Sequence, residues 1–144
     1  MMEAYNMSTT QTIERTTLTH LIYNEDYCRK VIPFIKPIYY ADRQERVVFE
    51  EIEKFLDKYN TLPTKETLTI GVDNRKDIND TEHGHIKDYI NTIADQETDE
   101  QWLLDTTEKW CKDRAVHNAV LSGIKILDGK DKRKTPEAIP HILS

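Results

Sequence analysis

The chain has 144 residues, of which 38% are hydrophobic and 32% charged. This length suits one domain, or a small domain with an appendage, and excludes an elaborate multi-domain enzyme. The net charge of −6, from 26 acidic and 20 basic side chains, argues against a protein whose whole surface embraces nucleic acid. With only 4 glycines and 5 prolines, long helices are favoured over a turn-rich β-sandwich. We expect an all-α fold.

The composition also indicates a compartment. No apolar run is long enough to span a bilayer, and residues 1–12 lack the basic and apolar regions of a signal peptide. Cys28 and Cys111 lie far apart and belong to no CxxC motif, which is typical of buried or half-buried thiols in a reducing compartment. We expect a soluble cytoplasmic protein with a flexible segment over residues 1–12.

The charge is unevenly distributed along the chain. Residues 73–100 hold nine acidic and three basic side chains, which account for the whole net charge, whereas residues 109–134 hold eight basic and three acidic ones. Such runs are most often solvated helix faces.

Three helices are predicted in the first part of the chain. Residues 12–24 place apolar side chains near one helical face, and Asn24 suits the N-cap of a second helix that Pro33 and Pro37 stop. Residues 42–59 are the clearest amphipathic segment. The apolar members of the three helices are Ile13, Leu18, Leu21 and Ile22, then Tyr27, Val31, Ile32 and Phe34, then Val47, Val48, Ile52, Phe55, Leu56 and Tyr59. The expected water-facing side chains of the third are Glu45, Arg46, Glu50, Glu53, Lys54 and Asp57.

Two further helices are expected before residue 97. Residues 67–72 alternate like a strand, but a lone short strand has no partner, so we predict a short helix capped by Thr64. Residues 78–94 repeat the helical period. The predicted globular helical domain therefore covers residues 13–97.

A long helix is predicted from a Thr98–Gln101 capping box to Asp128, which gives about 45 Å at about 1.5 Å per residue. We expect Trp102, Leu103 and Trp110 to pack its first half on the domain. Its second half is expected to project and to need another helix as cover. Residues 98–144 would form this helix, a turn at Gly129 and the start of a second hairpin arm.

Chemistry is sparse in this sequence. The four glycines form no phosphate-binding loop, and GxSxG, HExxH and paired CxxC motifs are missing. His83 and His85 with nearby carboxylates suggest a metal site, although two His flanking a Gly are more often loop or helix-start residues. Cys111 and His117 lie on different helical faces, which favours a buried thiol over a nucleophile. We assign no catalytic, cofactor or metal residue.

One cluster of basic and aromatic residues suggests nucleic-acid binding. Trp102 and Trp110, with Lys109, Lys112 and Arg114, have the composition of a base-stacking platform with phosphate contacts. Trp at helical spacing is more often part of a core. The residues alone therefore predict an acidic, all-helical protein-interaction domain.

Four stretches together resemble the N-terminal domain of DnaB-like replicative DNA helicases, most closely the T-even-phage type. Residues 18–40 are similar to the family's opening helices and its proline-then-aromatic element, and residues 46–68 to its helix with a central Phe and the capped helix that follows. Residues 102–120 are similar to the long helix of the phage proteins. Residues 138–144 are similar to the start of the linker helix before the motor domain.

The resemblance implies a non-catalytic collar domain above a hexameric motor ring. It implies dimer pairs within the hexamer, docking of primase and helicase loader, and single-stranded DNA passing through the whole ring in the infected host's cytoplasm. ATP and Mg belong to a motor domain that this sequence lacks. The residues expected to pair subunits are Val120, Ile124, Leu127, Ile139 and Leu143, and those expected to face a partner or DNA phosphate are Lys109, Lys112 and Arg114.

Two alternatives stay open at this point. The first is a stand-alone small helical DNA-binding or regulatory protein that uses the basic residues 109–134. The second is an enzyme built on His83, His85 and their neighbouring carboxylates. An apolar helical arm at the end of the chain also suggests a partner subunit, or a fragment of a longer protein.

Overall fold

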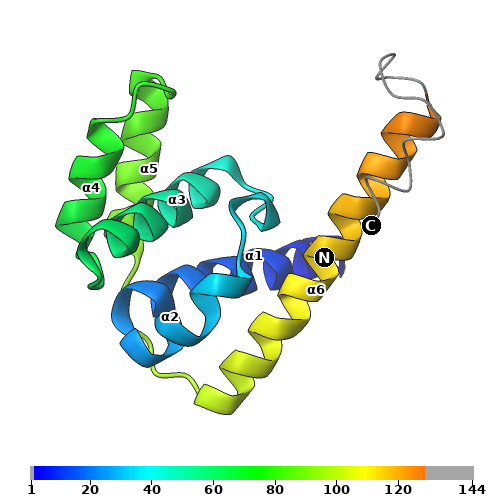
Figure 1. The fold of residues 1–144 in the computed structure, drawn as a ribbon, viewed down its shortest axis with the longest axis horizontal. Helices are drawn as coiled ribbons and strands as arrows, with labels where there is room; N and C mark the ends of the chain where they lie inside the picture. The colour runs from blue at the N-terminus through cyan, green and yellow to red at the C-terminus, as the bar shows by residue number, and fades with distance from the viewer. Residues whose placement is uncertain (1, 129–144) are drawn as a thin grey trace. The chain divides into compact units, whose positions relative to one another are not determined.

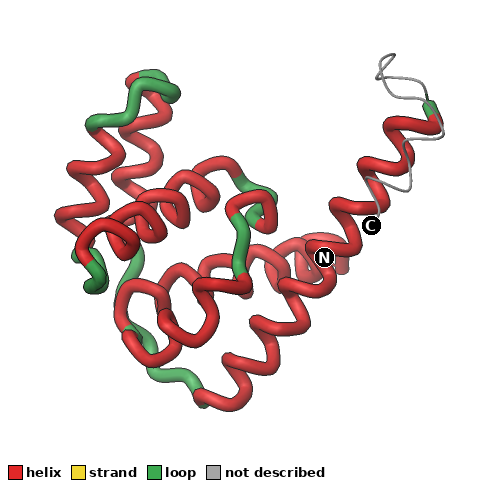
Figure 2. Tube along the Cα trace, in the orientation of Figure 1, coloured by secondary structure: helices red, strands yellow, loops and turns green. Residues whose placement is uncertain are grey.

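The computed structural model describes the backbone of residues 2–128 and the side chains of residues 12–128. Throughout the described backbone the regular secondary structure is helical (Figure 2), which confirms the expected all-α class. None of the described helices combines the length and apolar character that a bilayer crossing needs. The chain divides into two compact units, residues 1–107 and 108–144.

The first unit is built around one central helix. Its helices are α1 (Met2–Tyr23), α2 (Glu25–Val31), α3 (Arg43–Tyr59), α4 (Lys65–Asp73), α5 (Asp80–Thr92) and the start of α6 (Glu100–Leu127). Helix α3 contacts α1, α4 and α5, and α4 and α5 lie side by side (Figure 1). Short 3-10 turns at Ile32–Phe34 and Pro37–Tyr39 lead from α2 to α3.

Local capping sets several helix starts as predicted. The Asn24 side chain accepts a hydrogen bond from the Tyr27 amide at 3.0 Å and begins α2. Thr64 begins α4 through a reciprocal capping box with Thr67. This confirms a short helix, rather than a strand, over the alternating segment, because the cap satisfies backbone groups that a strand would leave unpaired.

The core gathers where α3 meets its neighbours. Val48, Phe49 and Ile52 are fully buried, and the Phe49 ring lies 5.2 Å from that of Tyr40. The apolar side predicted for residues 42–59 is not buried to its end, since Tyr59 is 56% exposed. At that end of α3 a groove separates it from α4, so the apolar side chains in the last turns of α3 are not fully covered.

Two predicted helix starts were wrong. Helix α1 begins at Met2, well before residue 12. The Thr98–Gln101 capping box does not form: the Trp102 amide donates to the Asp99 carboxylate at 2.9 Å. Thr98 is occupied elsewhere, with its hydroxyl 3.0 Å from His20 Nε2. The carboxylate one residue later therefore caps α6, because a nearby histidine holds the threonine.

Glu45 was expected to face water and is instead buried. It lies in the first turns of α3, which α5 covers, and it accepts a hydrogen bond from the Tyr89 hydroxyl at 2.5 Å. Burial, reinforced by a hydrogen bond with Glu14, raises the pKa of Glu45 to about 8. A protonated carboxyl thus joins α1, α3 and α5 inside the core.

The long helix predicted between residues 98 and 128 is confirmed. Helix α6 runs 28 residues without interruption, and the division between the two compact units falls inside it. The predicted boundaries, with a flexible 1–12, a globular 13–97 and a hairpin over 98–144, stay a prediction. The expected returning arm over 136–144 lies outside the described residues.

Candidate interaction surface

The part of α6 within the second unit exposes a line of large apolar side chains. Val116 is 65% exposed, Val120 52%, Ile124 46% and Leu127 70%. Their spacing of four, four and three residues places them on one side of the helix. We call these four residues the α6 stripe. Contiguous exposed apolar side chains of this kind mark interaction sites.

The sequence found most of this surface. Val120, Ile124 and Leu127 were predicted for subunit pairing, and the structure brings them together on one helical side. Val116 was missed, although its four-residue spacing from Val120 carries the same signal. The other two predicted pairing residues, Ile139 and Leu143, lie outside the described residues.

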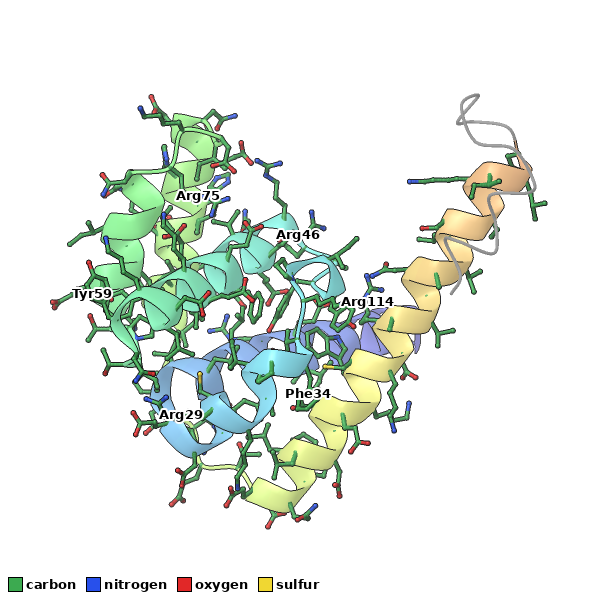
Figure 3. All side chains as sticks on the ribbon, viewed as in Figure 1. Arg29, Phe34, Arg46, Tyr59, Arg75 and Arg114 are labelled. Carbon is green, nitrogen blue, oxygen red and sulfur yellow. The ribbon has the colours of Figure 1, made fainter. Side chains whose placement is uncertain are left out.

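The three predicted phosphate-facing cations do not share one surface. Lys109 pairs with Asp113 at 2.9 Å, and Lys112 with Glu108 at 2.8 Å, each one helical turn apart. Arg114, labelled on α6 in Figure 3, is half-buried and lies about 140° around the helix from Lys109 at about 100° per residue. The two lysines are exposed but already matched by carboxylates.

The two tryptophans differ in burial and form no shared platform. Trp102 is 51% exposed, whereas Trp110 is 6% exposed. The expected packing of Trp102 on the domain was wrong, because Leu103 and Thr107 occupy the inward positions of α6. Leu103 is fully buried, and the Thr107 and Tyr27 hydroxyls lie 2.7 Å apart. Trp102, one residue before Leu103, is turned outward.

His83 and His85 do not lie together in a metal-binding arrangement within the described side chains. His83 Nε2 lies 3.1 Å from the Arg75 carbonyl oxygen, while His85 is exposed. Within residues 12–128, whose side chains are described, no group of three or more His, Cys, Asp or Glu side chains is placed to hold an ion. His83 instead fixes the loop before α5.

That loop is held by a cluster of charges around Arg75. The guanidinium contacts Glu50 and Glu51 of α3 at 2.9 Å each, and Asp77 at 2.7 Å. Arg75 is 15% exposed and Glu51 6% (Figure 3). The hydrogen bond from Arg75 lowers the pKa of Asp77. This cluster ties the α4–α5 loop to α3 and has the character of a structural network.

Neither cysteine is activated. Cys28 is buried and Cys111 half-buried, as predicted. Burial raises the pKa of each thiol to about 11, so both are protonated at neutral pH and poor nucleophiles. His117 is exposed on α6. The arrangement supplies no nucleophile and base pair.

Comparison with known proteins identifies a relative of the chain. No family profile matches the chain. The chain is 30% identical over 134 residues to a protein of Enterobacteria phage T4 described as a DnaB-like replicative helicase. The match covers 88% of this chain and 28% of that helicase, so the chain spans less than a third of its relative's length. This confirms the resemblance seen in the sequence: the chain is similar to part of a DnaB-like replicative helicase of the T-even-phage type.

Proposed function

We propose that the chain acts as the N-terminal collar domain of a phage replicative DNA helicase, in subunit assembly and in docking primase and the helicase loader. The similarity extends over 88% of the chain but only 28% of the phage T4 helicase, which fits one domain of a larger protein. The α6 stripe is the observation that carries the assembly role, because it presents apolar side chains that are about half exposed or more among the described residues.

Pairing through this stripe has a simple energetic basis. Fully burying one Val, Leu or Ile side chain stabilises by about 1.5–3 kcal/mol relative to leaving it exposed. The same stripe on two copies makes a self-complementary contact with two-fold symmetry. Three such dimers give the six subunits of the proposed ring.

The remaining parts of the proposal concern a longer protein. ATP and Mg would be bound by a motor domain, since this sequence has no phosphate-binding glycine loop. Single-stranded DNA would pass through the whole ring, in the cytoplasm of the infected cell. The collar would hold the subunits together and provide the surfaces that dock primase and the helicase loader.

The test removes the stripe. Ile124→Glu combined with Leu127→Glu places two charges on it, and light scattering across a concentration series should show the mass fall to that of one chain. Since each charge would have to be desolvated in the contact, we expect the dissociation constant to rise about 100-fold or more. The matched control is Ala115→Glu with Ser122→Glu, which adds the same charge on another side of α6.

Two outcomes would contradict the proposal. One is an unchanged mass in the stripe variant, and the other is a parent chain that stays a single copy at the highest concentration. A DNA titration addresses the alternative of a stand-alone DNA-binding protein, which the basic residues 109–134 favour. Tight binding by this chain with a steep salt dependence would support that alternative.

A further inference from the structure

A second surface lies on the first unit, between α3 and α4. It is a groove of about 300 Å³, which we call the α3–α4 groove. Its lining residues come from the last turns of α3 and one side of α4. The ones used below are Lys54, Phe55, Lys58, Tyr59, Ile70 and Asn74.

The walls of this groove are apolar and aromatic. The centres of the Phe55 and Tyr59 rings lie 4.7 Å apart. Tyr59 lies at the end of α3 beside α4 (Figure 3). Opposite them, Ile70 of α4 is 61% exposed. Two aromatic rings and an isoleucine therefore flank an open slot that suits one more large apolar side chain.

The rim of the groove on α3 is positive. Lys54 and Lys58 are exposed, and neither forms an ion pair within the described side chains. Lys58 Nζ lies 5.3 Å from the centre of the Tyr59 ring. The carboxylate in the groove, Glu51, is held by Arg75. The apolar walls and positive rim of the groove therefore suit a ligand with a large apolar side chain flanked by carboxylates.

The same chain offers that combination elsewhere. The linker into α6 carries exposed carboxylates at Asp95, Glu97 and Asp99, and Trp102 follows with half of its surface in solvent. We call residues 95–102 the Trp102 edge. Tryptophan, with tyrosine and arginine, is enriched among the side chains that dominate binding energy.

We propose that the Trp102 edge of one copy docks in the α3–α4 groove of a second copy. The indole would enter between Tyr59 and Ile70, and the carboxylates of Glu97 and Asp95 would face Lys54 and Lys58. The start of α6 lies apart from helices α3 and α4 on the first unit (Figure 1), and these two helices supply the lining of the groove. The contact is therefore head-to-tail, and it propagates to further copies, closing into a ring if the rotation from one copy to the next allows it.

This contact differs from pairing through the α6 stripe. It joins two unlike surfaces of the first unit, and it does not depend on the proposed two-fold contact. A single indole with a few ion pairs is small beside the roughly 1,200 Å² that stable interfaces bury. It would be weak between free chains and strong once other contacts hold the copies together, since the effective concentration then rises.

Short-range cross-linking of two cysteine variants tests the contact. The Asn74→Cys chain is mixed with the Gln101→Cys chain and treated with a short bis-maleimide. Native Cys28 and Cys111 react slowly, because burial raises their thiol pKa to about 11. We expect several-fold more mixed dimer than either like-with-like dimer, or than a mixture in which Lys36→Cys replaces Asn74→Cys.

Charge reversal makes the result specific. Adding Lys54→Glu and Lys58→Glu to the groove chain should reduce the mixed dimer several-fold, and Asp95→Lys with Glu97→Lys on the other chain should restore it. Adding Ile124→Glu and Leu127→Glu to both chains should leave cross-linking above the Lys36→Cys level, which separates this contact from the α6 stripe. Mixed dimer no more abundant than in the Lys36→Cys mixture, or unaffected by charge reversal, overturns the proposal.

Discussion

Helix α3 and the second half of α6 are both amphipathic, yet their apolar sides meet different fates. In α3, Val48 and Ile52 are fully buried because α1, α4 and α5 surround that helix. In α6, Val120 and Ile124 are about half exposed. Residues of the same kind at the same spacing thus stabilise the fold in one region and stay partly exposed in the other.

The largest expected difference between these regions is in stability. Phe49→Ala, in the fully buried part of α3, should lower the free energy of unfolding by about 3–5 kcal/mol, because it removes a ring packed against Tyr40 and leaves a cavity. Leu127→Ala, on the α6 stripe, should change it by less than about 0.5 kcal/mol at concentrations where the chain is a single copy. Urea unfolding followed by circular dichroism measures both.

The contrast fails if Leu127→Ala is as costly as Phe49→Ala. In that case the α6 stripe would belong to the fold, and pairing of copies would be part of folding itself. Repeating the urea titration at two protein concentrations distinguishes this case, because only a coupled assembly shifts its midpoint with concentration.

A smaller effect is expected from the buried carboxyl of Glu45. Its pKa is about 8 in the folded protein, against an ordinary value of 4.5, so unfolding releases its proton at neutral pH. Its contribution is fully present below about pH 4.5 and is lost as the pH rises through about 8. We expect a loss on the order of a few kcal/mol across that window.

Glu45→Gln isolates this effect. The amide can still accept from Tyr89 and donate to Glu14 but does not titrate. Urea midpoints between pH 5 and 9 should therefore fall less steeply in the variant, with the variant the more stable at pH 9. Urea midpoints that change equally with pH in the two proteins would show that Glu45 is already ionised in the folded protein.

The smallest expected effect concerns Gly71 on α4. A Cβ there would clash with the Glu51 carboxylate, which Arg75 holds at 2.9 Å. Gly71→Ala should gain about 1 kcal/mol in helix propensity but lose more by displacing this buried pair, a net destabilisation of about 1 kcal/mol by thermal unfolding. With Glu51→Ala already present, the same change should stabilise. A stabilising Gly71→Ala in the parent chain would show that Glu51 moves aside freely.

Local chemistry explains what could be predicted. The Asn24 and Thr64 caps, the extent of α3 and the long α6 follow from hydrogen-bonding groups and apolar spacing within a few residues of each other. Val120, Ile124 and Leu127 were identified in the same way, because helical spacing alone places them on one side. Such features need no knowledge of which helix lies next to which.

Other features depend on neighbours far along the chain. Glu45 is buried because α5 covers the start of α3, and Thr98 gives up its cap because His20 engages it. Trp102 faces solvent because Leu103 and Thr107 occupy the inward positions of α6 instead. In each case the local sequence allowed either assignment, and contacts between distant segments decided between them.

The sequence by itself determined that this protein is helical, where most of its helices begin and end, and which side of α6 is apolar. Those properties arise from capping and periodicity, which act over one or two helical turns. Only the tertiary structure decided that α3 and α4 leave a groove between them, that Trp102 stays outside the core, and that a protonated carboxyl lies within it. Burial is a property of packing between segments far apart in the chain, and no local pattern specifies it.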